Sequence, residues 1–271
     1  MYLGIDVGGT KTLIAAFDER GKITFEKTFH TPQSYSAFLD QLSFEVSPLE
    51  VDKFKSVCVG LPASVIDRDN SEAKIFTNLA WHNIKIAHDL RRIFPCPIYF
   101  ENDAKLAGYY EAIELGKKYD RVLYVTISTG IGYSLIVKEE INTEIGDPGG
   151  SDIYIERDGK MITWENATSG KAIVEKYGKK AEDINDEATW KLISKDINKG
   201  LLELIAILEP DAVVFGGSVG EYFHKYSEYL RSDLNRYKLP SLKLPDLIKA
   251  KEAEKAVVFG CYYYCKRNPN G

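Results

Sequence analysis

The chain has 271 residues, of which 44% are hydrophobic and 28% are charged, a composition typical of a globular protein with room for two modest cores. Its formal net charge of -5 argues against a general binder of nucleic acid or membrane surfaces, which usually displays a basic stripe. No window approaches an uncharged run of about 20 residues and the first residues lack a signal-peptide pattern, so we expect a cytoplasmic protein without a membrane span.

The first half of the chain alternates strand-like and helix-like segments. Residues 2–23 contain two apolar runs with strand character, joined by a corner at Gly8 and Gly9. Helical spacing over 34–46 and 86–94 predicts two helices, and 55–66 reads as a strand that runs into a Gly-Leu-Pro turn. Residues 96–116 predict a strand that ends at Glu101-Asn102-Asp103, followed by an Ala-rich helix. This alternation indicates an α/β fold.

The second half repeats the opening pattern. Residues 122–141 again read as apolar run, glycine turn, apolar run and charged turn, and matching Gly8 to Gly130 places Asp6 on Ser128. A long amphipathic helix over 187–209 then leads into a buried strand with a Gly-Gly turn over 211–220. The repeat predicts a small N-terminal lobe over 1–105, completed by a C-terminal helix over 252–271, and a larger lobe over 106–251.

The four cysteines, Cys58, Cys96, Cys261 and Cys265, form no CxxC pair and have no matching histidine cluster. This spacing favours reduced core thiols over a disulfide or a zinc site.

Three strand-to-glycine corners are distributed over both halves: "DVGGTK" (6–11), "ISTGIG" (127–132) and "VFGGSVG" (214–220). Glycines at the end of a strand permit close approach of a ligand to backbone amides, which suits phosphate. The Walker A pattern is absent, and no GxGxxG motif opens a helix after the first strand. Together the corners predict a phosphate clamp made by two lobes.

The ordered motifs resemble those of the ROK family of sugar kinases, within the actin-like ATPase superfamily. "DVGGTK" resembles the family's first phosphate motif and "STGIG" (128–132) its second, "ENDAKLAG" (101–108) is similar to the catalytic segment, and "PDAVVFGGSV" (210–219) to the adenosine motif. "GLP" (60–62) and "NLAW" (78–81) resemble sugar-side motifs. The resemblance implies a two-lobed actin-like ATPase (ribonuclease H-like) fold, each lobe a mixed sheet flanked by helices, with the ligand cleft between the lobes. It also implies ATP-dependent phosphorylation of a hexose hydroxyl.

Asp103 is the expected catalytic base, because a sugar hydroxyl is a poor nucleophile at neutral pH and its proton needs an acceptor. Asn102 is expected to contact sugar hydroxyls; alternatively, Asn102-Asp103 only caps the following helix. Asp6 is suited to hold Mg²⁺, directly or through water, near the phosphates. Thr10 and Lys11 are expected at phosphate oxygens, although Lys11 could equally be a solvated hairpin charge.

By this resemblance, the expected substrate-binding residues are Gly60, Leu61, Pro62, Asn78, Asn102, Asp103, Asp152 and Glu165. The expected nucleotide-binding residues are Asp6, Gly8, Gly9, Thr10, Lys11, Thr129, Gly130, Gly132, Gly216 and Gly217. The implied cofactors are ATP and Mg²⁺, and the implied partners are a sugar and a nucleotide, with a homodimer also compatible.

The interval 146–170 departs from the family pattern. Typical members carry a Gly-Glu-x-Gly-His segment and a cysteine-rich zinc loop here, whereas this interval contains no His and no Cys. Structural zinc is therefore not expected. Asp152 or Ser151 falls roughly where the His would be, and Glu165 matches a sugar-binding Glu, although it could also be a solvated residue at a helix start.

Sugar identity stays open because part of the expected recognition surface is rewritten. A glucose-type hexose phosphorylated at its 6-hydroxyl is the leading expectation, with N-acetylhexosamine, mannose and fructose as alternatives. Two other classes are weighed. A sugar-sensing regulator would carry an extra N-terminal DNA-binding domain, for which this chain, beginning at the first predicted strand, leaves no room. An actin-like structural or chaperone ATPase would not need the "END" segment.

Overall fold

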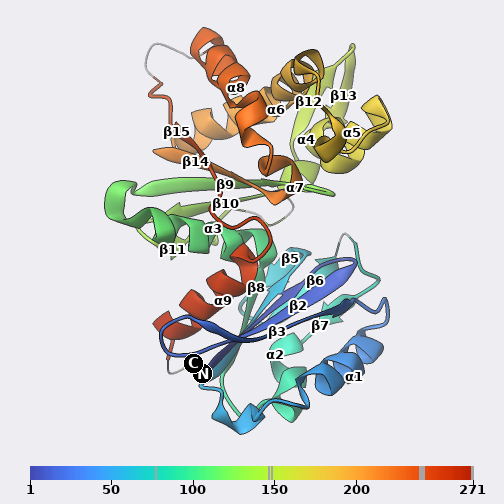
Figure 1. Cartoon of the computed structure of the whole chain (residues 1–271), viewed down its shortest axis with the longest axis vertical. Coiled ribbons are helices and arrows are strands. Elements are labelled where there is room, and N and C mark those ends of the chain that lie inside the picture. Colours follow the sequence, from blue (N-terminus) through green and yellow to red (C-terminus); the bar gives the residue numbers. More distant parts are fainter. Residues whose placement is uncertain (77, 146, 148, 238–241, 270–271) are drawn as a thin grey trace. The chain divides into compact units, whose positions relative to one another are not determined.

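The computed structural model describes residues 1–76, 78–145, 147, 149–237 and 242–269 (Figure 1). The chain divides into two compact units. Unit 1 comprises residues 1–110 and 255–271, and unit 2 comprises residues 111–254. The division expected from the sequence, between residues 105 and 106, and the one in the structure both fall within helix α3 (Asp103–Leu115).

Unit 1 is built on a five-stranded mixed sheet with the strand order β3-β2-β1-β4-β8. Its strands are β1 (Tyr2–Val7), β2 (Lys11–Phe17), β3 (Ile23–His30), β4 (Ser56–Leu61) and β8 (Ile98–Asn102). The first three strands pair antiparallel, whereas β1, β4 and β8 run parallel. The predicted hairpin around Gly8 and Gly9 and the predicted strand before Asp103 are therefore confirmed.

The two faces of this sheet follow the alternation of residues along β1. Leu3, Ile5 and Val7 join the apolar core beneath α1 (Tyr35–Val46) and α2 (Ile86–Asp89). Helix α9 (Ala256–Arg267) packs on β1 from the other face, where a Cβ added to Gly4 would lie 2.8 Å from the Val258 carbonyl oxygen. The helix predicted over 86–94 consists of α2 and a 3-10 turn, Leu90–Arg92.

A smaller antiparallel sheet of unit 1 contains β5 (Ala63–Asp67), β6 (Glu72–Phe76) and β7 (His82–Ile84), in the order β5-β6-β7. The predicted Gly-Leu-Pro turn is wrong for its first two residues. Gly60 and Leu61 lie in strand β4, because they pair with Glu101 and Asn102 of β8, and only Pro62 separates β4 from β5.

Unit 2 contains a second five-stranded sheet with the order β11-β10-β9-β14-β15. Its strands are β9 (Arg121–Ile127), β10 (Ile131–Val137), β11 (Glu140–Ile141), β14 (Ala212–Gly216) and β15 (Asp246–Lys249). Strands β11, β10 and β9 pair antiparallel, whereas β9, β14 and β15 pair parallel. This is the same sequence of pairings as in unit 1, which confirms the internal repeat. The predicted register was wrong: Asp6 pairs with Gly60 and Thr126 pairs with Gly216, so Asp6 corresponds to Thr126 and not to Ser128.

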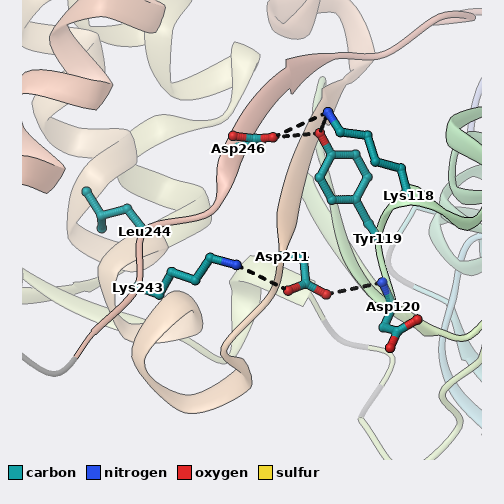
Figure 2. A pocket seen from close by; sticks show the side chains of 7 residues that line it. All are labelled: Lys118, Tyr119, Asp120, Asp211, Lys243, Leu244 and Asp246. Carbon is teal, nitrogen blue, oxygen red and sulfur yellow. Dashed lines mark hydrogen bonds and ion pairs between the residues drawn. The ribbon is translucent and has the colours of Figure 1, made fainter.

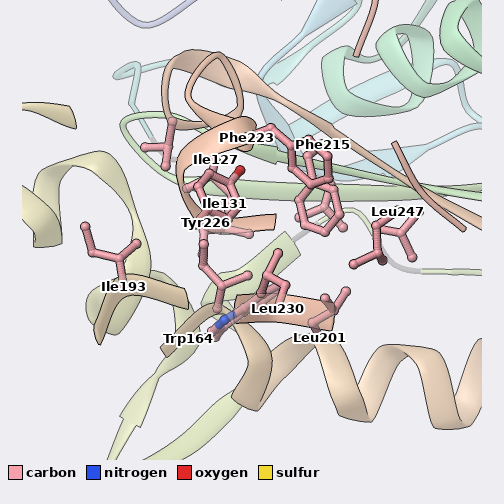
Figure 3. Packing of buried hydrophobic residues seen from close by; sticks show 14 of the residues in the cluster. Ile127, Ile131, Trp164, Ile193, Leu201, Phe215, Phe223, Tyr226, Leu230 and Leu247 are labelled. Carbon is pink, nitrogen blue, oxygen red and sulfur yellow. The ribbon is translucent and has the colours of Figure 1, made fainter. Parts of the chain in front are cut away.

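The helices of unit 2 pack with this sheet around one apolar core (Figure 3). They are α4 (Trp164–Thr168), α5 (Gly170–Tyr177), α6 (Glu187–Leu208), α7 (Gly217–Gly220) and α8 (Phe223–Tyr237). A hairpin of β12 (Tyr154–Arg157) and β13 (Lys160–Thr163) precedes α4. Helix α6 confirms the long amphipathic helix predicted from the sequence, and Asp186 caps it by accepting from the Thr189 backbone N–H at 2.8 Å.

None of the helices in the described ranges is long and apolar enough to cross a membrane. The four cysteines are free thiols, as expected, and Cys58, Cys261 and Cys265 are buried.

Candidate functional site

The carboxyl ends of the parallel strands in unit 1 bring three of the expected site residues together. Asp6 near the end of β1 pairs with Gly60 of β4, and Gly60 pairs with Glu101 of β8. Asp103 follows β8 directly as the first residue of α3, and a Cβ added to Gly60 would lie 3.7 Å from the Asp103 Cα. Ligands of open α/β sheets bind at this edge.

Asp6 and Asp103 hold protons more tightly than ordinary carboxyl groups. Burial raises the pKa of Asp103 to about 6, against the opposing effect of the Ala104 N–H, which donates to Asp103 Oδ1 at 2.7 Å. Burial and the neighbouring charge of Asp103 raise the pKa of Asp6 to about 7, and Lys11 opposes this shift. Two carboxylates that disfavour each other's charge suit a proton acceptor and a cation ligand.

The donor set at Asp6 and Asp103 fits Mg²⁺, which is usually bound through one or two carboxylates, substrate phosphates and water. Over the residues that the structure describes, no group of three or more His, Cys, Asp or Glu side chains is arranged to hold a metal ion. A magnesium site here would therefore be completed by the nucleotide.

Asn102 is buried and its side chain is bonded to the backbone. Its Nδ2 donates to the Ala63 carbonyl oxygen at 3.0 Å, and its Oδ1 accepts from the Lys105 N–H at 3.1 Å. The second bond caps the first turn of α3, so the capping role considered from the sequence is confirmed for Asn102. A contact of Asn102 with sugar stays a prediction. The second N–H of Nδ2 and the second lone pair of Oδ1 are the groups that could make it.

The glycine corner between β1 and β2 lies against another expected sugar-side residue. Gly8 donates to the Lys11 carbonyl oxygen at 2.9 Å, and a Cβ added to Gly9 would lie only 2.6 Å from the Asn78 Cβ. Thr10 and Lys11 are exposed. Leu61, also expected on the sugar side, is fully buried.

The nucleotide-side residues expected in unit 2 gather at the carboxyl ends of β9 and β14. The turn Ser128–Gly130 joins β9 to β10, and Gly132 of β10 pairs with Thr126. Gly216 pairs with Thr126 from the other side. Gly217 has φ +77°, and a Cβ there would lie 2.6 Å from the Ile127 carbonyl oxygen, so a larger residue would not fit.

Glu165 lies in the first turn of α4 and contacts the turn expected to bind phosphate. Its Oε2 accepts from the Ile131 N–H at 2.9 Å. Asp152, the other rewritten sugar-side position, is exposed. Its charge adds to burial in raising the pKa of the Tyr133 phenol on β10, so it too lies near this strand.

Sequence reasoning missed an ion pair behind the catalytic segment. Arg68, just after β5, donates from Nε to Glu101 Oε2 at 2.9 Å and from Nη2 to Oε1 at 2.5 Å. Glu101 Oε1 also accepts from the Asn102 N–H at 2.7 Å. No motif marks Arg68, since the two partners lie 33 residues apart and Arg68 sits in a hairpin turn.

A cavity of about 400 Å³ lies at the opposite, amino-terminal ends of β9, β14 and β15 (Figure 2). Its charged groups are bonded to one another: Asp211 Oδ2 accepts from the Asp120 and Arg121 N–H groups, and Tyr119 donates to Asp246 Oδ2 at 2.6 Å. The lining consists of Lys118, Tyr119, Asp120, Asp211, Lys243, Leu244 and Asp246, none of them an expected site residue.

Comparison with known families identifies the lineage, because the model of the ROK family matches residues 2–268. The chain belongs to the ROK family. The fructokinase of Lactococcus lactis subsp. cremoris is 25% identical over 236 residues, covering 81% of this chain and 79% of that protein. The glucokinase of Streptomyces coelicolor is 22% identical over 310 residues and covers 96% of both chains.

Solved structures agree on the fold. A ROK family glucokinase from Streptomyces griseus, in complex with glucose and AMPPNP, superposes with a TM-score of 0.81 at 19% identity and covers 98% of this chain and 99% of its own. The α/β fold with two mixed sheets flanked by helices, expected from the sequence, is therefore confirmed as that of the ROK kinases. The family also contains regulators: the xylose repressor of Bacillus subtilis is 22% identical and covers 86% of this chain and 68% of that protein.

Proposed function

We propose that the chain is an ATP-dependent hexose kinase that transfers the γ-phosphoryl group of ATP to a sugar hydroxyl, with a 6-phosphate as the leading product. The observation that supports this most is the position of Asp103. It follows a parallel strand directly, lies beside Asp6 and Gly60, and has a pKa raised by burial to about 6.

Asp103 acts as the general base. As the sugar oxygen attacks the γ-phosphorus and the bond to the leaving ADP oxygen breaks, the hydroxyl proton moves to the Asp103 carboxylate. The raised pKa makes this carboxylate a better proton acceptor while leaving it ionised near neutrality. Its Oδ1 is held by the Ala104 N–H at 2.7 Å, which fixes the orientation of the carboxyl group.

The glycine corners bind the phosphates. Backbone amides at Gly9–Lys11 and at Thr129–Gly130 would donate to phosphate oxygens, and the Gly216-Gly217 corner would lie at the adenosine side. Mg²⁺, when bound with ATP, supplies positive charge that neutralises the phosphate oxygens during transfer. Asp6 is the residue that would hold it, because its carboxylate lies at the same sheet edge as Asp103.

In unit 1, we propose Asn78, the Gly60–Pro62 segment and the Asp103 carboxylate for sugar recognition. In unit 2, the family resemblance implies this role for Asp152 and Glu165. A hexose of glucose type is the leading substrate. Fructose is supported by the similarity to a fructokinase, and N-acetylhexosamines and mannose follow from the missing histidine in 146–170.

The test is a coupled ADP-release assay of the purified chain with MgATP across glucose, mannose, fructose and N-acetylglucosamine, repeated with polyphosphate as donor. We expect sugar-dependent turnover. Asp103→Asn should lower kcat by about 10²–10⁴-fold while nucleotide binding is kept. Asp158→Asn is the matched control, because it changes an exposed carboxylate in the β12–β13 turn, at a φ of +54° that Asn tolerates.

Sugar-independent ATP hydrolysis would instead identify an actin-like ATPase. Sugar binding without any turnover would identify a sugar-sensing regulator. An Asp103→Asn variant with more than about a third of wild-type kcat would exclude Asp103 as the base.

A further inference from the structure

The carboxylate of Glu165 is attached to the second phosphate turn by a direct hydrogen bond. Its Oε2 accepts from the Ile131 N–H at 2.9 Å, immediately after the turn Ser128–Gly130. The same oxygen would lie 2.5 Å from a Cβ added to Gly130. A larger residue at 130 would have to displace this carboxylate.

A second contact from the same segment holds the other end of the turn. Gly170 donates from its N–H to the Ser128 carbonyl oxygen at 2.6 Å, and a Cβ at Gly170 would lie 2.7 Å from that oxygen. Between these two contacts, Ser169 donates to the Glu165 carbonyl oxygen at 2.9 Å and caps α5. Residues 165–170 therefore form a short rigid support that holds Ser128 at one end and Ile131 at the other.

The support is itself anchored in the core of unit 2. Trp164, the neighbour of Glu165, is fully buried, and its Nε1 donates to the Asp196 carbonyl oxygen at 3.2 Å (Figure 3). A Cβ added to Gly200 would lie 2.3 Å from the Trp164 ring. Because helix α6 fixes the indole, the Glu165 backbone cannot shift easily when the phosphate turn is loaded.

We propose that Glu165 is a positioning residue for the phosphate turn as well as a sugar ligand, so that one carboxylate serves both substrates. This inference rests on the proposed kinase function. Oε2 fixes the backbone at Ile131, and with it the direction of the Thr129 and Gly130 amides that would face phosphate. Among the described residues, Oε1 makes no hydrogen bond, and a sugar hydroxyl would donate there.

Two variants of Glu165 separate the roles. Glu165→Gln keeps an oxygen that can accept from the Ile131 N–H, whereas Glu165→Ala removes it. Titration with AMPPNP and Mg²⁺ in the absence of sugar should show affinity about 3- to 10-fold weaker for Glu165→Ala and within about twofold of wild type for Glu165→Gln. Both variants should raise the sugar KM, since both lose the charge on the acceptor.

Glu175→Ala is the matched control. This acid lies on α5 with its side chain 66% exposed, and among the described residues its side chain interacts only with Lys171, as an ion pair. Hydrogen exchange provides a second readout. The peptide that contains residues 128–132 should exchange faster in Glu165→Ala and at the wild-type rate in Glu165→Gln and Glu175→Ala.

The positioning role would be overturned if Glu165→Ala bound nucleotide as tightly as wild type, or if both Glu165 variants lost the same affinity. The kinase assignment would stand in either case, provided that the wild-type chain binds nucleotide and turns over sugar. A wild-type chain that binds no nucleotide would overturn both.

Discussion

Asp6 and Asp103 illustrate, at the scale of single residues, a conflict between stability and function. Each has a pKa raised above the ordinary value of 3.8, to about 7 and about 6. Between the ordinary and the raised value, the folded chain keeps a proton that the unfolded chain has lost. Stability from these groups therefore falls as the pH rises from about 4 to about 7.

The raised pKa of Asp103 predicts an acid limb in the pH dependence of kcat/KM. Because the base must be ionised, kcat/KM for the sugar, measured at saturating MgATP so that bound metal keeps Asp6 ionised, should fall about tenfold per pH unit below about pH 6 and level off above it. A pH–rate profile of the wild-type chain with glucose checks this. A profile that stays flat down to pH 4.5 would show that no buried carboxylate acts as the base.

Replacing Asp6 should stabilise the protein and inactivate it. Asp6→Asn removes a carboxylate whose ionisation is disfavoured by burial and by Asp103, so the gain in free energy of unfolding should be larger at pH 8 than at pH 5, by about 1–3 kcal/mol. Urea denaturation at both pH values measures this difference, with Asp158→Asn as the exposed control. An equal gain in the free energy of unfolding at both pH values would contradict the raised pKa of Asp6.

At the scale of elements, Arg68 and Lys74 of the β5–β6 hairpin in unit 1 form ion pairs with different neighbours. Arg68 binds Glu101, whose carboxylate also holds the Asn102 N–H. Lys74 binds Asp67 at 2.6 Å, within the hairpin itself. Only the first pair connects the hairpin to the segment that carries the expected base.

Arg68→Met should therefore impair catalysis more than Lys74→Met. Removing the guanidinium leaves Glu101 buried without its cation, and we expect kcat/KM for the sugar to fall at least about tenfold, with partial rescue in Arg68→Lys. Lys74→Met should change kcat/KM less than about twofold, since surface pairs contribute little. Steady-state kinetics of the three variants tests this prediction. Equal losses of kcat/KM in Arg68→Met and Lys74→Met would refute a special role for the Arg68–Glu101 pair.

In helix α6, packing and helix propensity predict opposite effects of a Gly→Ala substitution on stability. Gly→Ala inside a helix usually stabilises by about 1 kcal/mol. At Gly200 the added Cβ would lie 2.3 Å from the Trp164 ring, so Gly200→Ala should instead destabilise by about 1–3 kcal/mol, as overpacking does. Chemical denaturation measures the difference, and a stabilised variant would show that the indole can move.

Much of the fold was predictable because the motifs mark strand ends. The hairpin at Gly8-Gly9, the strand before Asp103 and the helix over 187–209 all follow local patterns. The register of the internal repeat was not predictable, because Gly8 and Gly130 occupy different places in their turns. Only the strand pairing reveals that Asp6 corresponds to Thr126. The bonds of Glu165 to Ile131 and of Arg68 to Glu101 join distant residues, and no local pattern encodes them.

At the scale of the whole molecule, each unit has its own sheet, apolar core and set of expected ligand residues. Ligands that bind only the folded chain stabilise it in proportion to their occupancy. The expected carboxylate ligand Asp6 belongs to unit 1, and the turn Ser128–Gly130, expected to bind phosphate, belongs to unit 2.

Nucleotide should therefore stabilise the chain in a magnesium-dependent way. AMPPNP at about 100 times its Kd should add about 2.7 kcal/mol to the free energy of unfolding when Mg²⁺ is present, and clearly less after EDTA treatment. Thermal or urea unfolding with and without EDTA measures this, and the Asp6→Asn variant should respond little to the metal. Equal stabilisation with and without Mg²⁺ would argue against a metal-bridged nucleotide.

Helix α9 is the last element of the chain, yet it covers the first strands. Tyr262 packs against the rings of Tyr2 and Phe17, with centroids 5.6 and 5.1 Å apart, and Gly4 lies against the Val258 backbone. During synthesis, β1 and β2 emerge well before α9, so this face of their sheet stays uncovered while the intervening residues are made. Unit 2, continuous from 111 to 254, can fold in that interval, and the nascent chain is expected to expose an apolar sheet face until α9 has emerged.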